Sequence, residues 1–387
     1  MRVVIASDAL PLPFGRADAR WLYVLASELA RRSIDVTCVS CTSEPEEPVD
    51  EAEKLAAERG FHLRHVPKRL SESRLRRNAE AALRPKTELR RVDALRTALL
   101  DELRAGYDVL HLEHPQLGWA ADEFPRSVVY LHHLELVDWE GRPYLSLRER
   151  RTFMQLRRSE RRVLSRTRRL VVASRRLQAE VRRFRAGDDV PVVPVALDPS
   201  LYDLVPARPD PVVGVIGTMD WYPSRSAAER VLTGIWPSIA AERPDAKLVV
   251  AGWNAGRHLG YLFPIPGATL VGPVPHPRDF FSRISVLLYP PPRGSGMKIK
   301  VLEAMAYGVP AVTNGEGAEG LDVVGSTPVA EAESDAEFTR TTLDLLADPE
   351  RREALRGAGR SAIEDHFSPV PAVDRLLETY RALGLTS

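Results

Sequence analysis

Lysine is scarce in this sequence, cysteine is nearly absent, and long apolar runs are missing. Only six of the 54 basic residues are lysines, so arginine carries most of the positive charge. The formal net charge is +1, which gives the protein no overall field for attracting nucleic acid. No apolar run approaches the roughly 20 residues that span a bilayer, and the N-terminus is typical of a short strand rather than a signal peptide. We therefore expect a cytoplasmic protein that binds no nucleic acid.

The two cysteines, Cys38 and Cys41, form one C-x-x-C sequence at the end of a predicted strand. Zinc would require two more ligands nearby, and a thioredoxin-like site would require a following helix with its own sequence context. Because the sequence offers neither, these residues are predicted to pack in a core.

Strand and helix patterns alternate along the chain, pause at a proline-rich stretch, and then begin again. A chain of 387 residues is longer than one hydrophobic core usually holds, so two domains are expected. The apolar patterns predict strands at 2–7, 36–40, 109–112, 128–131, 170–173, 192–195, 212–216, 247–251, 269–271, 286–289 and 311–313. They predict helices at 19–31, 227–241, 278–283, 298–307 and beyond residue 334. Such alternation favours parallel sheets, so the predicted fold class is α/β, with two Rossmann-like doubly wound domains facing across a cleft.

The proline-rich stretch sets the predicted domain boundaries. It covers residues 196–211, A-L-D-P-S-L-Y-D-L-V-P-A-R-P-D-P, and is typical of a linker. We predict a first domain at 1–196, a linker at 197–211 and a second domain at 212–387. The last helices of the second domain are also candidates for packing back on the first.

A glycine turn that leads into a predicted helix carries two of the six lysines. The sequence from Arg293 to Pro310 is R-G-S-G-M-K-I-K-V-L-E-A-M-A-Y-G-V-P. Gly296 lets the backbone approach a ligand, and the N–H groups of a helix start attract an anion. Lys298 and Lys300 add point charges suited to phosphate, and Glu303 is placed to accept hydrogen bonds from a ribose diol. The pattern indicates a nucleotide diphosphate site; the alternative is an ordinary amphipathic helix whose lysines are solvated.

Four motifs in this order resemble those of retaining glycosyltransferases of the GT-B fold, family 4 type (glycosyl transferases group 1). They are the proline-glycine loop at 13–15, G-T-M-D-W at 217–221, G-P-V at 272–274, and G-S-G-x-K-x-K-V-L-E-A-M-A-x-G-x-P at 294–310. The resemblance covers nearly the whole chain. It implies two Rossmann-like domains, a nucleotide-sugar donor held mainly by the C-terminal one, and an acceptor bound mainly by the N-terminal one. It also implies no metal, and no cofactor other than the donor as co-substrate.

The resemblance assigns the donor site in the second domain residue by residue. Glu303 matches the second glutamate of the family's E-x7-E motif, which binds the ribose, whereas Ser295 stands where the first glutamate would be. A subgroup with this departure has basic residues at the positions of Lys298 and Lys300, which are implied to serve the phosphates. Thr218 stands in the place of the family's phosphate-binding arginine. The other implied donor contacts are Gly217, Thr218, Ser295, Gly296 and, for the base, the backbone at Val274.

The resemblance also assigns a glycine loop and a histidine in the N-terminal domain. Gly15 would let the loop approach the donor phosphates, with Arg16 reaching an oxygen; a plain strand-to-helix turn is the alternative. His132 matches the family's active-site histidine, which meets the transferred sugar. His133 and Glu135 are then acceptor-binding or supporting groups.

Histidines and glutamates gather at the ends of two predicted strands. H-L-E-H occupies 111–114 and H-H-L-E occupies 132–135. Imidazole and carboxylate groups are good metal ligands, so a metal site is an alternative to the sugar-binding role. The spacing shows no clear set of partner ligands, and we predict no metal.

An arginine-rich segment follows these histidines. Residues 142–185 contain 16 arginines against three acidic residues, Glu149, Glu160 and Glu180. Such a field attracts an anionic lipid surface or a phosphorylated acceptor, and no aromatic interleaving accompanies it to indicate nucleic acid. Peripheral contact with an anionic membrane is one interpretation; arginines that only solvate exposed helix faces are the other.

The sequence thus predicts a metal-independent glycosyltransferase that moves a sugar from a nucleotide diphosphate donor to an acceptor hydroxyl with retention. Other activities of the same fold, such as nucleotide-sugar epimerisation or non-glycosidic coupling, are alternatives. An inert nucleotide-sugar-binding scaffold is another, which the missing first glutamate favours. The base, the sugar, the acceptor and the oligomeric state have no signature in the sequence.

Overall fold

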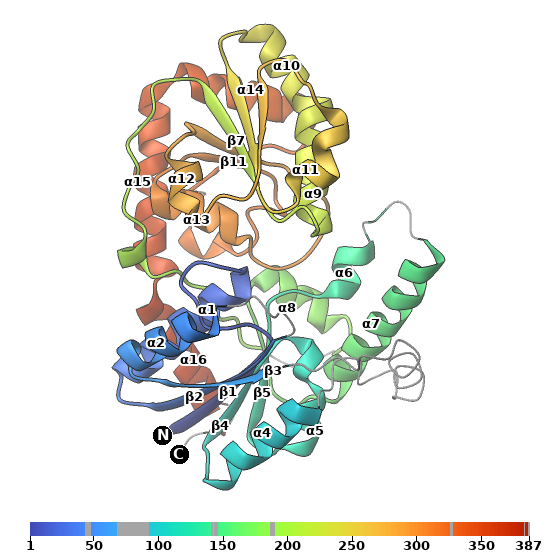
Figure 1. Ribbon diagram of the computed structural model, residues 1–387, viewed down its shortest axis with the longest axis vertical. Helices are drawn as coiled ribbons and strands as arrows, with labels where there is room; N and C mark the ends of the chain where they lie inside the picture. The colour runs from blue at the N-terminus through green and yellow to red at the C-terminus, as the bar shows by residue number, and fades with distance from the viewer. Residues whose placement is uncertain are drawn as a thin grey trace. The chain divides into compact units, whose positions relative to one another are not determined.

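The computed structural model describes residues 1–42, 48–67, 93–140, 142, 146–185, 190–325, 328–382 and 384–385. The chain forms two compact units (Figure 1). The first consists of Met1–Ala196 together with Pro369–Ser387, and the second of Leu197–Ser368. Each unit is built on one six-stranded sheet with parallel strand pairs.

The sheet of the first unit has the strand order β3-β2-β1-β4-β5-β6. Its strands are β1 (Arg2–Ser7), β2 (Asp35–Thr42), β3 (His62–Pro67), β4 (Val109–Glu113), β5 (Ser127–Leu131) and β6 (Leu170–Val172). The central strands are buried on both faces, as expected for a parallel sheet covered by helices. Because the chain winds outward from β1 in one direction and from β4 in the other, the loops after these strands diverge at a topological switch point.

Successive residues of a strand face opposite sides of the sheet, and the helices divide accordingly. One face is covered by α1 (Ala17–Arg31), α2 (Val49–Arg59) and α16 (Pro369–Ala382), and the other by α4 (Asp93–Arg104), α5 (Trp119–Glu123), α7 (Leu147–Arg166) and α8 (Arg175–Arg182) (Figure 1). The short α6 (Glu135–Glu140) precedes α7. His111 and Glu113 of β4 face the first of these sides. There Glu113 contacts Trp21 of α1, and His111 contacts Tyr380 of α16.

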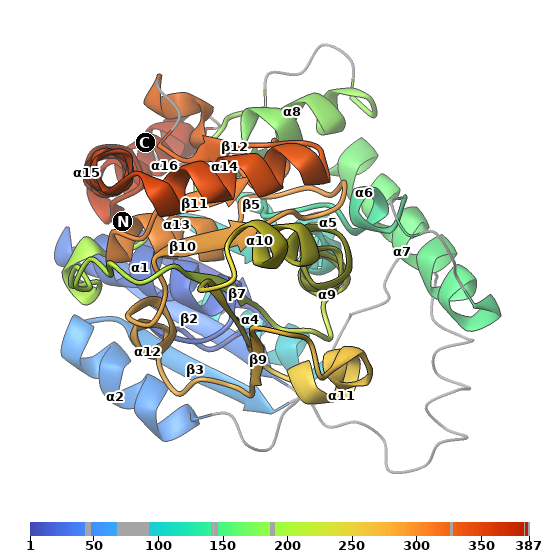
Figure 2. The same ribbon diagram turned by 90° about the horizontal axis from the view of Figure 1, so that it is seen from above.

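The second sheet has the order β12-β11-β10-β7-β8-β9, which repeats that of the first when strands are counted from β7. Its strands are β7 (Val212–Ile216), β8 (Lys247–Ala251), β9 (Ala268–Val271), β10 (Val286–Tyr289), β11 (Ala311–Thr313) and β12 (Ala330–Glu331). One face is covered by α9 (Tyr222–Arg230), α10 (Trp236–Glu242), α11 (Ala255–Leu259) and α14 (Asp335–Ala347), the other by α12 (Pro277–Phe281), α13 (Ile299–Tyr307) and α15 (Pro349–His366). Figure 2 shows α14 lying along the sheet beside β11 and β12. The predicted fold class is confirmed: both units are doubly wound and Rossmann-like.

Two predicted elements differ from the structure. The segment predicted as a strand at 192–195 forms only an isolated parallel bridge, between Val172 and Val192. Pro191 has no N–H to donate to a ladder, and β6 itself is three residues long, so the sheet ends there. The helix predicted at 227–241 begins earlier, at Tyr222, and is interrupted by a π-helical segment, Val231–Ile235.

The predicted linker at 197–211 is packed within the second unit. Carbonyl groups of this segment accept hydrogen bonds from arginines of α15. Arg360 donates to the Tyr202 carbonyl at 2.6 Å, and Arg356 donates to the Val205 carbonyl at 2.7 Å. Tyr202 is also buried, so the segment contributes to the core of this unit.

The end of the predicted second domain, 212–387, belongs to the first unit from Pro369 onward. Here α16 packs on α1, and the guanidinium group of Arg32 contacts the Asp374 carboxylate and donates to the Val370 carbonyl at 3.1 Å. The C-terminal helix is therefore a structural part of the N-terminal domain.

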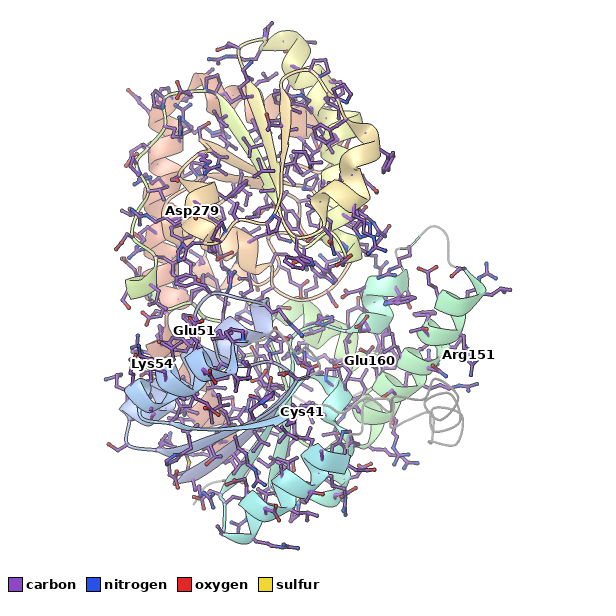
Figure 3. The ribbon with its side chains drawn as sticks, viewed as in Figure 1. Cys41, Glu51, Lys54, Arg151, Glu160 and Asp279 are labelled. Atoms are coloured by element: carbon purple, nitrogen blue, oxygen red, sulfur yellow. The ribbon has the colours of Figure 1, made fainter. Side chains whose placement is uncertain are left out.

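Both cysteines are buried and free, as predicted. Cys41 lies on β2 (Figure 3) and belongs to the core beneath α4, whereas Cys38 faces the other side. Burial raises the pKa of the Cys38 thiol, which keeps it protonated and unreactive. No helix in the described part of the chain is both long enough and apolar enough to cross a bilayer.

The loop after β8 is expected to tolerate no side chain at Gly252. Its φ is +137°, and an added Cβ would lie 1.8 Å from the carbonyl oxygen of Gly217. Gly252→Ala should lower the free energy of unfolding by at least about 2 kcal/mol, the scale of backbone strain combined with a clash. Thermal unfolding measures this, with Gly256→Ala as the control, because an added Cβ there meets no atom within 4 Å. A Gly252→Ala protein as stable as the wild type contradicts this loop geometry.

Candidate functional site

The carboxyl ends of β7 and β10 in the second unit hold a fixed positive charge, that of Lys300. Its Nζ donates to Ser224 Oγ at 2.6 Å and to the Tyr289 hydroxyl at 3.2 Å. The ammonium group lies 4.3 Å from the centroid of the Tyr289 ring and 5.1 Å from that of Trp221. Tyr289 ends β10, and Ser224 lies in the first turn of α9. These contacts keep the charge of Lys300 at the switch point of this sheet.

Gly217 brings bare backbone beside this charge. An added Cβ at Gly217 would lie 2.6 Å from Ser224 Oγ and 3.3 Å from Lys300 Nζ, so only glycine fits. Thr218 follows it in the same loop, and its carbonyl accepts a hydrogen bond from the Trp221 N–H at 3.1 Å. The structure thus brings two predicted donor contacts, Gly217 and Lys300, together at one point.

The loops after β7, β8 and β9 lie next to one another along this edge of the sheet. The Gly217 N–H donates to the Ala251 carbonyl at 3.2 Å, and the Gly252 N–H donates to the Gly272 carbonyl at 3.1 Å. Val274 is part of the third loop and is half-buried. Its predicted contact with a nucleotide base stays a prediction.

The glycine turn before α13 is held by a buried carboxylate that the sequence analysis missed. Glu319 Oε1 accepts a hydrogen bond from the Gly296 N–H at 2.9 Å, and its Oε2 lies 4.0 Å from Lys298 Nζ. Lys298 Nζ donates to the Ser295 carbonyl at 3.0 Å and to that of Gly296. The side chain of Lys298 is 3% exposed, so in this structure its ammonium group supports the turn. Its predicted contact with phosphate stays a prediction.

Glu303 lies on α13, one turn after the helix begins, and is 5% exposed. Ser295, in the place of the family's first glutamate, is likewise buried. Both therefore belong to the interior of this edge rather than to the outer surface. The ribose contact predicted for Glu303 is not tested by the geometry.

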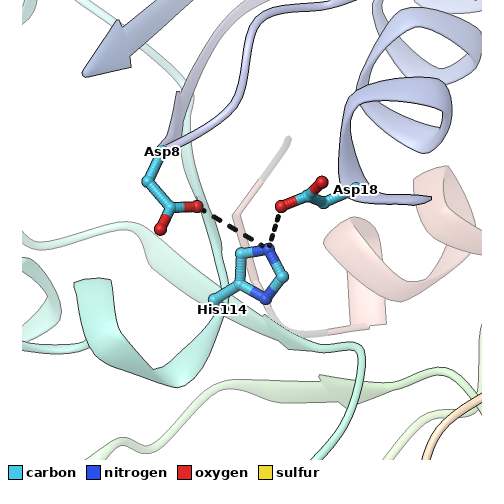
Figure 4. Close-up of side chains that lie close together, drawn as sticks. All are labelled: Asp8, Asp18 and His114. Carbon is cyan, nitrogen blue, oxygen red and sulfur yellow. Dashed lines mark ion pairs between the residues drawn. The ribbon is translucent and has the colours of Figure 1, made fainter. Parts of the chain in front are cut away.

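In the first unit, a cluster of opposite charges lies at the switch point between β1 and β4 (Figure 4). His114 Nε2 is 3.4 Å from Asp18 Oδ2 and 3.9 Å from Asp8 Oδ1. Arg16 Nη2 is 2.6 Å from Asp18 Oδ2 and 4.0 Å from Asp8 Oδ1. Burial alone would raise the pKa of Asp18, but the nearby His114 ring and the guanidinium group of Arg16 hold it well below its usual range. Asp18 is therefore ionised.

Asp8, Asp18 and His114 also form the one group of three metal-type ligands found among the described residues, with ligand atoms within 4.8 Å of one another. Two carboxylates and an imidazole suit a divalent cation. The guanidinium group of Arg16, however, already lies against both carboxylates and supplies the compensating positive charge. We assign no metal to this cluster.

Gly15 and Arg16 occupy the loop between β1 and α1. An added Cβ at Gly15 would make ordinary contacts, 3.7 Å from Ala19 Cβ and 3.8 Å from Leu12 Cβ. The protein itself therefore does not require glycine here. The guanidinium group of Arg16 is directed toward Asp18. Its contact with a donor phosphate stays a prediction.

His132 directly follows β5 and is 11% exposed at its side chain. Its Nε2 contacts the carboxylate of Glu113, and its ring centroid lies 4.6 Å from that of His114. Burial lowers the pKa of His132, against the opposing effect of the Glu113 charge. The predicted catalytic histidine is thus a largely buried ring whose pKa favours the neutral form.

His133 and Glu135 lie in a second group that reaches α7. His133 Nδ1 is 3.0 Å from Asp138 Oδ2. The carboxylate of Glu160 accepts hydrogen bonds from the N–H groups of Glu135 at 2.9 Å and Leu136 at 2.8 Å, at the start of α6. Figure 3 shows Glu160 on the inner side of α7. Glu135 therefore helps to dock α6 on α7, a contact that its predicted acceptor role did not anticipate.

A cavity lies elsewhere, at the amino ends of β7, β10 and β11 in the second unit. It measures about 630 Å³ and is lined by arginines from several elements. Arg208 pairs with Asp210 at 3.0 Å and Arg243 with Asp245 at 3.1 Å. Because ligands of such sheets bind at the carboxyl ends, we do not assign the candidate site to this cavity.

Two doubly wound units, each with a charged cluster at its switch point, define the GT-B class of glycosyltransferase. Two protein-family models match the chain: Glycosyltransferase Family 4 over residues 19–201, and Glycosyl transferases group 1 over residues 210–348. The chain belongs to the group 1 glycosyltransferases and is a transferase. A comparison with the curated proteins finds no match.

Solved structures share this fold over nearly the whole chain. HepE from Anabaena, in complex with UDP and glucose, has a TM-score of 0.68 at 13% identity, covering 98% of this chain and 99% of its own. WaaG, a glycosyltransferase involved in lipopolysaccharide biosynthesis, has a TM-score of 0.66 at 15% identity, covering 96% and 98%. A TarM variant from S. aureus has a TM-score of 0.68 at 10% identity, covering 98% and 99%. These identities establish the fold alone.

The group around His133 and Glu160 should make stability fall as pH rises. Burial raises the pKa of Glu160 to about 8 from its ordinary 4.5, although the N–H groups of Leu136 and Glu135 oppose this. Burial alone would lower the pKa of His133, but its hydrogen bond to Asp138 raises it to about 9 from 6.5. For both groups the pKa is higher in the folded state than in the unfolded state. The stability that each group contributes is therefore fully present below its unfolded pKa and is lost as pH rises through its folded pKa.

Thermal midpoints measured from pH 5 to 9 should therefore decline across this range, most steeply between about pH 6.5 and 8, where both groups contribute. Glu160→Gln carries no charge at any pH and should make this decline shallower. Glu140→Gln, at an exposed position of helix α6, should leave the profile unchanged. Identical profiles for Glu160→Gln and the wild type would show that Glu160 does not titrate as described.

Proposed function

We propose that this chain is a retaining glycosyltransferase that moves a sugar from a nucleotide diphosphate sugar to an acceptor hydroxyl without a metal ion. The observation that carries the proposal is the fixed ammonium group of Lys300 at the β7–β10 switch point, beside the bare backbone of Gly217. Ligands of open α/β sheets bind at such points. A lysine next to glycine backbone and a helix start suits a diphosphate.

Stabilisation of developing charge is the main task of this group. When the bond between sugar and diphosphate breaks, negative charge builds on the leaving group. Lys300 and the first N–H groups of α13 would stabilise that charge. Lys298 would add its charge and keep the turn at Ser295 and Gly296 in shape. Glu303 would accept hydrogen bonds from the ribose, while Thr218 and Val274 would offer backbone contacts.

The first unit would supply the groups that meet the sugar and the acceptor. We assign His132 to the transferred sugar, and Arg16, in the loop after Gly15, to a donor phosphate. His133 and Glu135 would support the acceptor side. In this assignment Arg16 and Lys300 provide the positive charge that a metal ion would otherwise bring.

Ligands of the similar structures support a nucleotide-sugar donor. HepE is described in complexes with UDP and glucose and with UDP-glucose, and the TarM variant with UDP and α-GlcNAc-glycerol. Each complex contains a nucleoside diphosphate and a sugar, as one molecule or as two, which supports the donor class proposed here. Saccharide, lipid-linked and natural-product hydroxyl groups are all suitable acceptors in this proposal.

Donor-site variants test the proposal by separating leaving-group charge from ribose binding. A thermal-shift screen of nucleoside diphosphates first identifies the base, since a ligand at 100 times its Kd adds about 2.7 kcal/mol of stability. Lys300→Ala should then lower kcat at saturating donor more than it raises KM, because its charge matters most in the transition state. Glu303→Ala should weaken donor and free nucleotide alike by roughly ten- to hundredfold. Lys247→Ala, an exposed lysine of the same unit, is the control.

Circular dichroism must show that each variant is folded, because Glu303 is buried. Wild-type affinity and turnover in both folded variants would remove the donor-site assignment. The anomeric configuration of the product, followed by NMR, should match that of the donor, and inversion would contradict the retaining reaction. Activity should also survive chelation of divalent metals.

The outer face of α7 supports peripheral contact with anionic lipid, which we propose in addition. Leu147 and Met154 are 85% and 45% exposed. Arg151 and Arg158 are exposed as well, and spacings of four, three and four residues place all four side chains on one face. Figure 3 shows Arg151 on the outer side of this helix. Apolar and cationic side chains on one exposed face suit the surface of an acidic bilayer.

Binding to vesicles that contain acidic lipid should weaken steeply with salt, because exposed charges are screened beyond a Debye length of roughly 10 Å at 0.1 M. Arg151→Gln should weaken it about fivefold, since one basic residue near such a surface contributes about 1 kcal/mol. Arg340→Gln, an exposed arginine of the second unit, should have no effect. Co-sedimentation measures both, and absence of binding at low salt would leave the arginines as solvated side chains.

A further inference from the structure

A buried carboxylate at the end of β4 is surrounded by three N–H groups. Glu113 is 1% exposed. Its Oε1 accepts a hydrogen bond from Trp21 Nε1 at 3.1 Å and lies 2.9 Å from His111 Nε2. Its Oε2 contacts His132 Nε2. Burying a charge is costly unless it is paired and hydrogen-bonded, and here α1, β4 and the residue after β5 all contribute donors.

The charge of Glu113 determines where the protons of the two rings lie. Burial alone would raise the pKa of Glu113, but its hydrogen bonds with His132 and His111 hold the pKa below its usual range. An ionised carboxylate only accepts hydrogen bonds, so both rings must present an N–H at Nε2. A neutral imidazole has one N–H, which leaves Nδ1 as an acceptor.

The contact between Tyr380 and His111, at the other end of the network, is consistent with this assignment. Its hydroxyl lies 2.6 Å from His111 Nδ1, and both side chains are fully buried. Burial, with the charge of Glu113, raises the pKa of Tyr380 well above its usual value, so the hydroxyl keeps its proton. Because a neutral His111 ring with its N–H at Nε2 has only a lone pair at Nδ1, the Tyr380 hydroxyl donates and His111 Nδ1 accepts. The hydrogen bonds thus run in one direction from Tyr380 through His111 to Glu113.

The surroundings of His132 favour the same neutral form. Burial lowers its pKa, and the charge of His114 lowers it further, against the effects of Glu113 and Asp18. The remaining close ring, that of Tyr130, lies edge-on with its centroid 4.6 Å away. Among the described residues, the hydrogen bond of the His132 ring is the one through Nε2 to Glu113. Its other nitrogen is left for a substrate.

We propose that Glu113 is a positioning residue that holds His132 as the neutral Nε2–H tautomer, so that Nδ1 of His132 accepts a hydrogen bond from a sugar hydroxyl. The inference rests on the proposed function, which places His132 at the transferred sugar. A ring nitrogen that offers a lone pair binds a hydroxyl donor and repels a phosphate oxygen. In this proposal His132 therefore binds a hydroxyl group of the substrate, and the diphosphate binds at the site of Lys300.

The tautomer can be measured directly on the full-length wild-type protein. With 15N-labelled histidine, long-range proton–nitrogen NMR distinguishes the two neutral tautomers and the charged ring. A His132→Gln spectrum identifies the His132 signals among those of the nine histidines. We expect a neutral ring protonated at Nε2 near pH 7. An Nδ1–H tautomer or a doubly protonated ring overturns the proposal without any activity measurement.

Two variants connect this tautomer to turnover. Glu113→Gln has the same shape but can donate to His132 Nε2, so it should populate the Nδ1–H tautomer and lower kcat by roughly ten- to hundredfold, the range for losing a hydrogen bond to a charged group. Tyr380→Phe should lower kcat only a few-fold, because one neutral hydrogen bond is lost. Tyr107→Phe, which removes an exposed hydroxyl of the same unit, is the control. Affinity for free nucleoside diphosphate should not change in any of them.

The outcomes separate this proposal from the proposed function. A fall in kcat with the His132 tautomer unchanged overturns the positioning role of Glu113. An altered tautomer with unchanged turnover overturns the sugar contact of His132, and with it that part of the proposed function, while the lysine donor site stands. If Glu113→Gln does not fold, Tyr380→Phe and the wild-type spectrum decide the question.

Discussion

Both sheets have the same strand order, and this order determines where the polar groups of the candidate site lie. Parallel strands all end at the same edge of a sheet, and helices cover both faces. The sheet cores are therefore mostly apolar, and the charged groups of the candidate site gather at the strand ends, in the loops that follow them and on the helices that begin there. In the first unit this edge carries Asp8 and Glu113 at β1 and β4, and in the second Gly217 and Tyr289 at β7 and β10.

The two sheet edges differ in the charge that they carry. In the second unit the ammonium group of Lys300 donates to two hydroxyl groups and lies near two aromatic rings, which together orient its charge. In the first unit the carboxylate of Glu113 is surrounded by donors and its charge is distributed over a hydrogen-bonded network. One edge thus offers an oriented cation, suited to an anion, and the other offers directed hydrogen bonds, suited to hydroxyl groups.

Local patterns in the sequence were sufficient for the fold and for part of the site. Apolar runs predicted most buried strands, and the family resemblance predicted that Lys300 and Gly217 belong to one site. β3 was missed because its sequence, H-L-R-H-V-P, lies at a sheet edge and lacks an apolar run or a regular alternation. Glu319 was missed because its contact with Gly296 spans 23 residues and leaves no local signature. Sequence motifs also showed Lys298 as a charge, but not that its own loop carbonyls would take up its hydrogen bonds.

The position of Tyr380 has a consequence for the order in which this protein is completed during synthesis. The hydrogen bond between His111 and Tyr380 joins residues 269 positions apart, with the whole second unit between them. At about 5–20 residues per second, the ribosome needs roughly 13 to 54 s to advance from one to the other. Throughout that time the face of the first sheet that α16 covers is left without its last helix. The domain made first is therefore the domain finished last, and the second can reach its folded state before it.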